Sequence, residues 1–161
     1  MKLRILMIVC CVLLPAASSF AQTAPDKAPD VTADLRAGFD EVNGWVTKAA
    51  EMVPADKYNY RPVDTVRTFG QIIAHITDSY NFFCARGAGN KVEYSDATEK
   101  GATDKDTLLP KLKEAVGRCN AAYSSPTPQL RPLFNNVGHT SLHYGNIITY
   151  MRMLGMKPPS S

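Results

Sequence analysis

The sequence predicts an all-α protein, a four-helix bundle, on two observations. Apolar residues recur at helical spacing in four segments, which are separated by stretches rich in Gly, Pro and polar residues. No segment shows the alternation of apolar and polar residues that is typical of a half-buried strand. The chain has 161 residues, which suits a single domain. Four amphipathic helices joined by loops of moderate length favour a bundle.

Residues 1–21 are typical of a secretory signal peptide. Lys2 and Arg4 form a positive n-region, residues 5–14 form an apolar h-region, and small residues surround a cleavage point after Ala21. The apolar run is too short to span a bilayer comfortably. Residues 22–30 are small, polar and Pro-containing, which indicates a flexible tether. We therefore expect an exported protein, periplasmic or secreted, with no membrane segment after cleavage and with a bundle over residues 31–161.

The first two helices are predicted from their apolar stripes and from the residues that begin or end a helix. The first helix is expected over residues 31–53, where Pro54 ends it, and a loop over residues 55–66 follows. The second is expected over residues 69–86, with Thr68 as its N-cap and Gly87 just beyond its end. Both segments carry a continuous apolar stripe, formed in the first by Leu35, Phe39, Val42, Val46 and Ala49.

The last two helices follow the same rules. A polar loop over residues 90–103 leads to a third helix over residues 105–123, in which Pro110 is tolerated because it falls near the first turns. A turn-rich connection over residues 124–128 comes next. The fourth helix is expected over residues 136–154, ending at Gly155.

All three histidines of the chain fall on two of these helices. His139 and His143 are four residues apart, about one helical turn, so their side chains share a face. His75 lies within the second helix on a face of mixed polarity. Two imidazoles from one helix and a third from a neighbour would form a three-nitrogen site with open coordination positions, as catalytic zinc often has. Surface or hydrogen-bonded histidines are the competing interpretation of this spacing.

The residues that flank these histidines exclude several well-known sites. The zincin helix needs Glu directly after its first His, and Thr140 stands there. Di-iron bundles need Glu three residues before each ligand His, where this chain has Ile72, Asn136 and Thr140. The sequence also lacks the C-x-x-C-H, P-loop and G-x-G-x-x-G motifs.

Two stretches place the histidines in a recognisable context. Tyr-Arg-Pro at residues 60–62 is followed by the segment 68–76, and residues 139–146 read His-x-x-x-His-x-Gly-Asn and continue to Gly155. These motifs resemble the DinB/YfiT-like family of four-helix metalloenzymes, over nearly the whole chain from about residue 35. The resemblance implies a DinB-like bundle with His75, His139 and His143 as the ligands of one metal ion. Asn146 stands where the family commonly has Gln.

The family resemblance also implies a class of chemistry, because its known members include metal-dependent thiol transferases and isomerases. We expect one divalent metal, zinc or nickel, and a metal-dependent hydrolase or thiol transferase that acts on a small molecule. The alternative is a non-catalytic protein in which the metal stabilises the bundle or recognises a ligand. Polar residues on the histidine faces are candidates for contacts with the ligand histidines, namely Gln71, Asp78, Ser79, Asn146 and Tyr150.

Cys84 and Cys119 are the cysteines that remain after signal cleavage. Cys84 lies nine residues after His75, about half a turn away around the helix, so it is a poor metal ligand. Cys119 lies on the apolar stripe of the third helix. In an exported protein we expect a disulfide that joins the second and third helices. Two buried free thiols are the alternative.

The charge of the chain limits its partners. Cleavage after Ala21 removes Lys2 and Arg4, so the formal net charge falls by two, from +3 to +1. No stripe of Lys and Arg follows, and we therefore expect no nucleic-acid partner. A small-molecule substrate is the expected partner of a monomer or a homodimer.

Overall fold

The structure is a computed structural model that describes residues 30–161. Its helices are α1 (Val31–Met52), α2 (Phe69–Gly87), α3 (Lys105–Tyr123) and α4 (Leu130–Met153), with a short 3-10 helix η1 (Ala55–Lys57) between the first two. The described residues contain no strand, so the predicted all-α four-helix fold is confirmed. The predicted signal peptide and residues 22–29 of the predicted tether lie outside this range. Within it, no helix has the length and apolar character that a membrane crossing requires.

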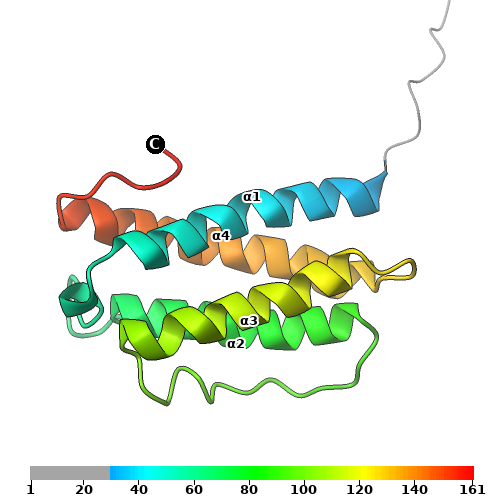
Figure 1. Cartoon of the computed structure of the whole chain (residues 1–161), viewed down its shortest axis with the longest axis horizontal. Helices are drawn as coiled ribbons and strands as arrows, with labels where there is room; N and C mark the ends of the chain where they lie inside the picture. The colour runs from blue at the N-terminus through cyan, green and yellow to red at the C-terminus, as the bar shows by residue number, and fades with distance from the viewer. Residues whose placement is uncertain (1–29) are drawn as a thin grey trace, which may run out of the picture.

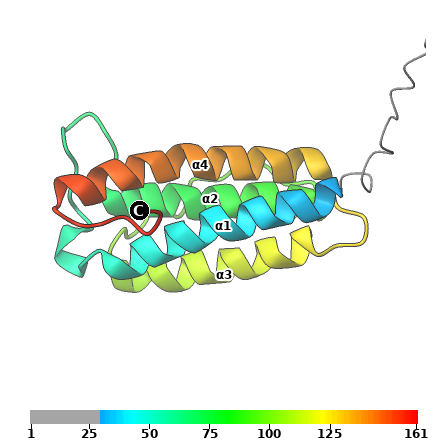
Figure 2. The same ribbon diagram turned by 90° about the horizontal axis from the view of Figure 1, so that it is seen from above.

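The direction of the helices gives this bundle one long connection. Helices α2 and α3 run in the same direction, while α1 and α4 run in the opposite one (Figures 1 and 2). Residues 88–104 must therefore return from the end of α2 to the start of α3, and Figure 1 shows them running back along the bundle. Long crossovers of this kind occur in several families of four-helix bundles. Here the crossover passes along α2, the helix that carries His75.

The N-terminus of α2 is fixed by a capping box and by a close backbone contact. The Thr68 hydroxyl accepts from the Gln71 N–H at 3.1 Å, and the Gln71 side-chain oxygen accepts from the Thr68 N–H at 2.9 Å. Gly70 lies so close to the crossover that a Cβ atom there would be 2.2 Å from the carbonyl oxygen of Thr103. The start of α2 is therefore held tightly against the end of the crossover.

Helix α4 begins at Leu130, six residues before the predicted start at Asn136. Pro132 does not prevent this, because it is the third residue of the helix, where a backbone N–H would have no intrahelical partner. Leu133 is fully buried and draws this extra turn and a half against the core. At the other end Gly155 has a φ of 72°, which allows the chain to leave the helix in a left-handed cap.

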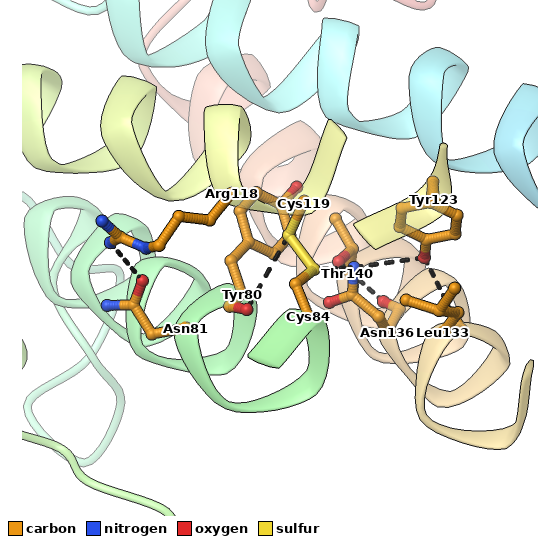
Figure 3. The surroundings of a disulfide bond; sticks show 9 residues. All are labelled: Tyr80, Asn81, Cys84, Arg118, Cys119, Tyr123, Leu133, Asn136 and Thr140. Carbon is orange, nitrogen blue, oxygen red and sulfur yellow. Dashed lines mark hydrogen bonds between the residues drawn. A yellow bond between two sulfur atoms is a disulfide. The ribbon is translucent and has the colours of Figure 1, made fainter. Parts of the chain in front are cut away.

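The core beside the disulfide is aromatic. The Phe39 ring stacks on Tyr123 with 4.5 Å between centroids and meets the edge of Tyr80 at 5.5 Å. The predicted disulfide between Cys84 and Cys119 is present and joins α2 to α3 (Figure 3). Both cysteines are buried, so the bridge is part of the packed interior.

Asn136 belongs to this disulfide region. Its amide nitrogen donates to the Tyr123 hydroxyl at 3.3 Å and lies 3.5 Å from the Cys84 sulfur (Figure 3). The side chain is completely buried and is therefore part of the polar packing around the bridge.

Candidate metal centre

Helices α2 and α4 bring the three histidines to one point. The Nε2 atom of His139 lies 3.2 Å from Nε2 of His75 and 3.2 Å from Nε2 of His143. One ligand atom from each of the three lies within 4.8 Å of the others. The pair on α4 shares a face, as its four-residue spacing predicts, and the antiparallel packing of α2 supplies the third ring.

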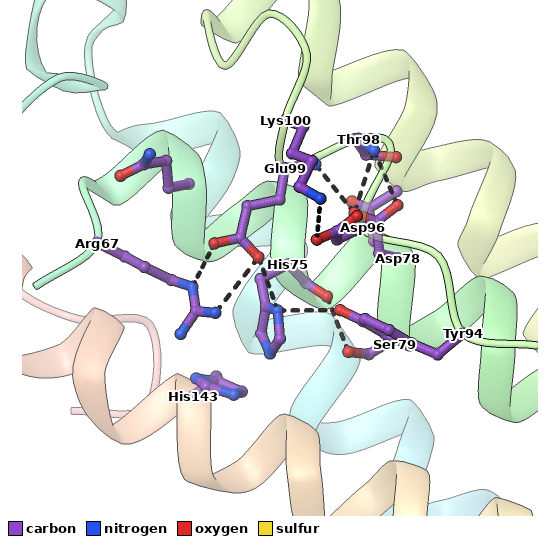
Figure 4. A network of polar contacts seen from close by, with 12 residues as sticks. Arg67, His75, Asp78, Ser79, Tyr94, Asp96, Thr98, Glu99, Lys100 and His143 are labelled. Carbon is purple, nitrogen blue, oxygen red and sulfur yellow. Dashed lines mark hydrogen bonds and ion pairs between the residues drawn. The ribbon is translucent and has the colours of Figure 1, made fainter.

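Glu99, from the crossover, determines which nitrogen of His75 is free. Its Oε2 lies 3.0 Å from Nδ1 of His75 (Figure 4). A carboxylate accepts only, so the imidazole proton belongs on Nδ1 and the lone pair on Nε2. That lone pair points at the other two histidines. The arrangement is the carboxylate–histidine pair that commonly supports a metal ligand.

Two further groups hold Glu99 in place. Arg67 donates from Nε to Glu99 Oε1 at 2.6 Å, which fixes the second carboxylate oxygen. The Asp78 carboxylate accepts from the backbone N–H of Glu99 at 2.9 Å and from that of Thr98 at 3.1 Å (Figure 4). Because Asp78 is buried on α2, it anchors the crossover at the point where Glu99 reaches His75.

The two histidines of α4 are held in the neutral form. Burial, and after it the neighbouring histidines, lowers the pKa of His143 to about 4. Burial and the nearby His75 lower the pKa of His139 to about 4 as well. Neutral imidazoles are the form that binds metals, so His139 and His143 need no deprotonation near neutral pH.

The donor set fits a divalent metal ion. Two imidazole nitrogens that bind a tetrahedral zinc at about 2.0–2.1 Å are about 3.3–3.4 Å apart, close to the 3.2 Å separations here. Lone pairs that face each other at this distance repel unless a proton or a cation lies between them. The buried Nδ1 of His139 has no hydrogen-bond partner among the described residues, so the carboxylate contact of His75 is not repeated at His139.

The five polar candidates from the sequence take different places. Asn146 contacts one of the three histidines directly, with Nδ2 at 3.4 Å from Nδ1 of His143. Ser79 donates to the backbone carbonyl of His75 at 2.8 Å. Asp78 holds the crossover. Gln71 caps α2 through Thr68 and so contributes to the helix start, away from the imidazoles. Tyr150 donates to the backbone carbonyl of Arg67 at 2.8 Å.

Three residues of this network were not predicted from the sequence, namely Glu99, Arg67 and Tyr94. All three lie in connections, where helical periodicity gives no information about direction. The Tyr94 hydroxyl lies 3.2 Å from Nδ1 of His75, on the same side as Glu99. For Glu99 and Tyr94 the available signal was that the predicted loop 90–103 is long for a bundle and carries carboxylates. No comparable signal pointed to Arg67.

A cavity of about 520 Å³ opens beside the histidines. His143, Glu99 and Asn146 line it together with Arg67 and Tyr150. Its size suits a small molecule. The imidazole cluster is thus approachable from the side where His143 meets the crossover.

The fold and the site together define a four-helix bundle that presents three histidines from its second and fourth helices to a small cavity. The sequence model of the DinB superfamily matches residues 39–151, and the chain belongs to this superfamily.

Among solved structures, the chain is similar to a DinB-like protein from Bacillus cereus ATCC 10987. The two share 15% sequence identity, the match covers 79% of this chain and 95% of the other, and the TM-score is 0.63. At that identity the likeness shows the shared fold. No curated protein matches the sequence.

Proposed function

We propose that this protein binds one divalent metal ion, zinc or nickel, through His75, His139 and His143, and uses it as a metal-dependent hydrolase or thiol transferase on a small molecule. The observation that carries the proposal is the convergence of three Nε2 atoms, with 3.2 Å from His139 to each of the others. Three imidazoles suit either metal. Membership of the DinB superfamily supports the same ligand set.

The metal would supply a Lewis acid, which lowers the pKa of a bound water or thiol or polarises a carbonyl. The protein side chains have distinct tasks around it. Glu99 holds the proton of His75 on Nδ1 and so aims Nε2 at the site. Arg67 donates to the other oxygen of that carboxylate and so orients it. Asn146 positions the ring of His143 from the next turn of α4.

The surroundings of the histidines favour a catalytic role over a structural one. Structural zinc sites are usually closed by four protein ligands, whereas catalytic sites keep a position open. In residues 30–161, the potential ligand group consists of the three histidines, and the cavity of about 520 Å³ lies next to His143. A small molecule entering there would reach the metal and meet Asn146 and Tyr150.

Export to the periplasm or the cell exterior is part of the proposal. The n-region, h-region and small residues around Ala21 support it. The disulfide between Cys84 and Cys119 is compatible with an oxidising compartment. In that compartment the bundle would act as a monomer or a homodimer.

Metal analysis of the purified protein tests the proposal. We expect one bound metal ion per chain in the wild type and a near-complete loss in His143→Ala. Ser141→Ala is the matched control, because Ser141 is exposed on the same helix and its hydroxyl bonds only to the Val137 carbonyl. Circular dichroism shows whether each variant keeps its helices. Equal metal content in the wild type and His143→Ala would rule out the site.

A screen with ester, thioester and thiol-acceptor substrates then separates the two classes of function. Turnover that disappears on chelation and returns with zinc or nickel supports the enzyme. The structural alternative is supported if the folded protein binds one metal ion per chain and is stabilised by it, yet turns over no substrate with zinc or with nickel.

A further inference from the structure

A second cavity, of about 590 Å³, lies between the end of α2 and the start of α4. Phe82, Phe83 and Arg86 line it from α2, and Arg131 and Asn135 line it from α4. None of the side chains that carry the histidine network of Figure 4 takes part in it. The cavity therefore has its own chemistry, which the proposed metal site leaves unused.

The cavity adjoins the histidine cluster. The ring of Phe83 lies 5.7 Å from that of His139, measured between centroids. Asn135 is one turn before His139 on α4, about 6 Å along the axis. On α2, Arg86 follows His75 by eleven residues, which is about three turns and returns it to within about 20° of the same face, about 16 Å away. Arg86 therefore lies on the same side of α2 as His75 and is separated from it by about three helical turns.

The cavity is positively charged. Its lining includes Arg86 and Arg131 and no carboxylate. Neither arginine forms an ion pair with another described residue, whereas four other arginines do, namely Arg36, Arg61, Arg67 and Arg118. Arg86 instead lies 5.3 Å from the ring centroid of Phe82. The first turn of α4 has no side-chain cap, so its N–H groups add positive potential at this end.

We propose that this cavity binds an organic anion. A carboxylate or phosphate group lies between Arg86 and Arg131, and an apolar body lies on Phe82 and Phe83. Binding of the anion depends on the residues of this cavity alone.

The first experiment measures binding of three probes to metal-free wild-type protein by calorimetry. The probes are 4-phenylbutyrate, 3-phenylpropyl phosphate and the neutral alcohol 4-phenylbutanol. We expect at least one of the two anions to bind about tenfold or more tightly than the alcohol, because hydrogen bonds to charged groups are the strong ones. The two anions separate a carboxylate site from a phosphate site. Equal affinity for all three probes would overturn the inference.

Variants test the two arginines. Arg86→Gln and Arg131→Gln should each weaken anion binding by about tenfold and leave the affinity for the alcohol unchanged. Both side chains are exposed, so the variants are expected to fold. Arg152→Gln is the matched control, because Arg152 is exposed on the same helix and lies outside the cavity. If Arg152→Gln lowers the anion affinity as much as Arg86→Gln and Arg131→Gln do, the affinity reflects the net charge of the protein. That result would refute the site.

Metal content measured on the same samples separates this inference from the proposed function. The arginine variants should retain the metal, and His143→Ala should retain anion binding. If the protein holds no metal but binds anions through Arg86 and Arg131, the anion site is supported and the proposed metal-dependent function is refuted. If the protein holds metal but binds no anion, the anion site is refuted and the metal site is supported.

Discussion

At the scale of single residues, the orientation of His75 depends on a carboxylate from another part of the chain. Glu99 lies 24 positions later in the sequence and contacts Nδ1 of His75 at 3.0 Å. Carboxylates of this kind fix the tautomer and the ring orientation of a metal ligand. The histidines alone would therefore make a looser site than the one this chain forms.

Glu99→Gln tests that dependence. An amide carries no charge and donates as well as accepts, so it no longer fixes the proton on Nδ1. We expect metal affinity to fall by about 10–100-fold, measured by competition with a chromogenic chelator. Glu93→Gln, an exposed residue of the same crossover, should retain wild-type affinity. If both variants bind metal like the wild type, Glu99 does not position the ligand.

The pKa values of His139 and His143 predict how the metal-free protein responds to acid. Both pKa values are about 4 in the folded state, whereas the ordinary pKa of histidine is 6.5. Between pH 4 and pH 6.5 the unfolded chain therefore binds protons at these two residues that the folded chain does not bind. The stability contribution of these neutral rings is present above pH 6.5 and is lost as pH falls toward about 4.

Urea unfolding of the metal-free protein between about pH 7 and pH 4 measures this loss. The doubly substituted His139→Gln/His143→Gln protein cannot titrate at these positions, and its stability should change less with pH over the same range. Identical pH dependence of the two proteins would show that these imidazoles do not control acid stability.

At the scale of elements, the contact between α2 and the crossover determines where Glu99 lies. Besides the contacts of Glu99 and Tyr94 with His75, the crossover is attached to α2 through Asp78 and through the close approach of Gly70 to Thr103. Without these attachments a connection that runs the length of the bundle would have no fixed register. The site is therefore shared between a helix and a loop.

Gly70→Ala tests the attachment between Gly70 and Thr103. A Cβ atom would lie 2.2 Å from the Thr103 carbonyl oxygen and 3.2 Å from that of Tyr58, so the backbone must move. We expect a loss of about 1–3 kcal/mol in the free energy of unfolding, measured with denaturant. Gly117→Ala is the control, because no atom lies within 4 Å of its added methyl group and alanine favours a helix. Equal stability changes in the two variants would contradict the role given to Gly70.

At the scale of the whole molecule, the disulfide links α2, which carries His75, to α3. Its cysteines are separated by 35 residues, and the closed loop includes the whole crossover. The bond therefore restricts the unfolded chain across the region that must assemble the site.

Removing the disulfide should be costly for that reason. In the loop-entropy model a 35-residue closure contributes about 3–4 kcal/mol, which the double variant Cys84→Ala/Cys119→Ala should lose. Denaturant unfolding of the wild type with and without a reductant gives the matched comparison. A thiol count on the denatured, unreduced wild type should find no free thiol from these two residues. Two titratable thiols would show that the bridge is not formed.

Particular residues show how much of the fold and the site could be predicted from the sequence. The caps and breakers Thr68, Pro54 and Gly155 located most helix ends, because each acts within one or two turns of its own position. The start of α4 was placed too late, since Pro132 was compatible with the helix and the burial of Leu133 is a tertiary effect. Motif context joined His75 to His139 and His143, which spacing alone left open.

The sequence by itself determined the helices, the family motifs and the three histidines, because helical period, capping and ligand type are local properties of the chain. Only the tertiary structure decided that Glu99 and Arg67 support His75, that Gln71 serves as a cap, and that Arg86 and Arg131 meet across one cavity. The physical reason is that a connection has no period, so its side-chain directions follow from packing. The direction of α2 relative to α3, which requires the long crossover, is likewise a property of the assembled bundle.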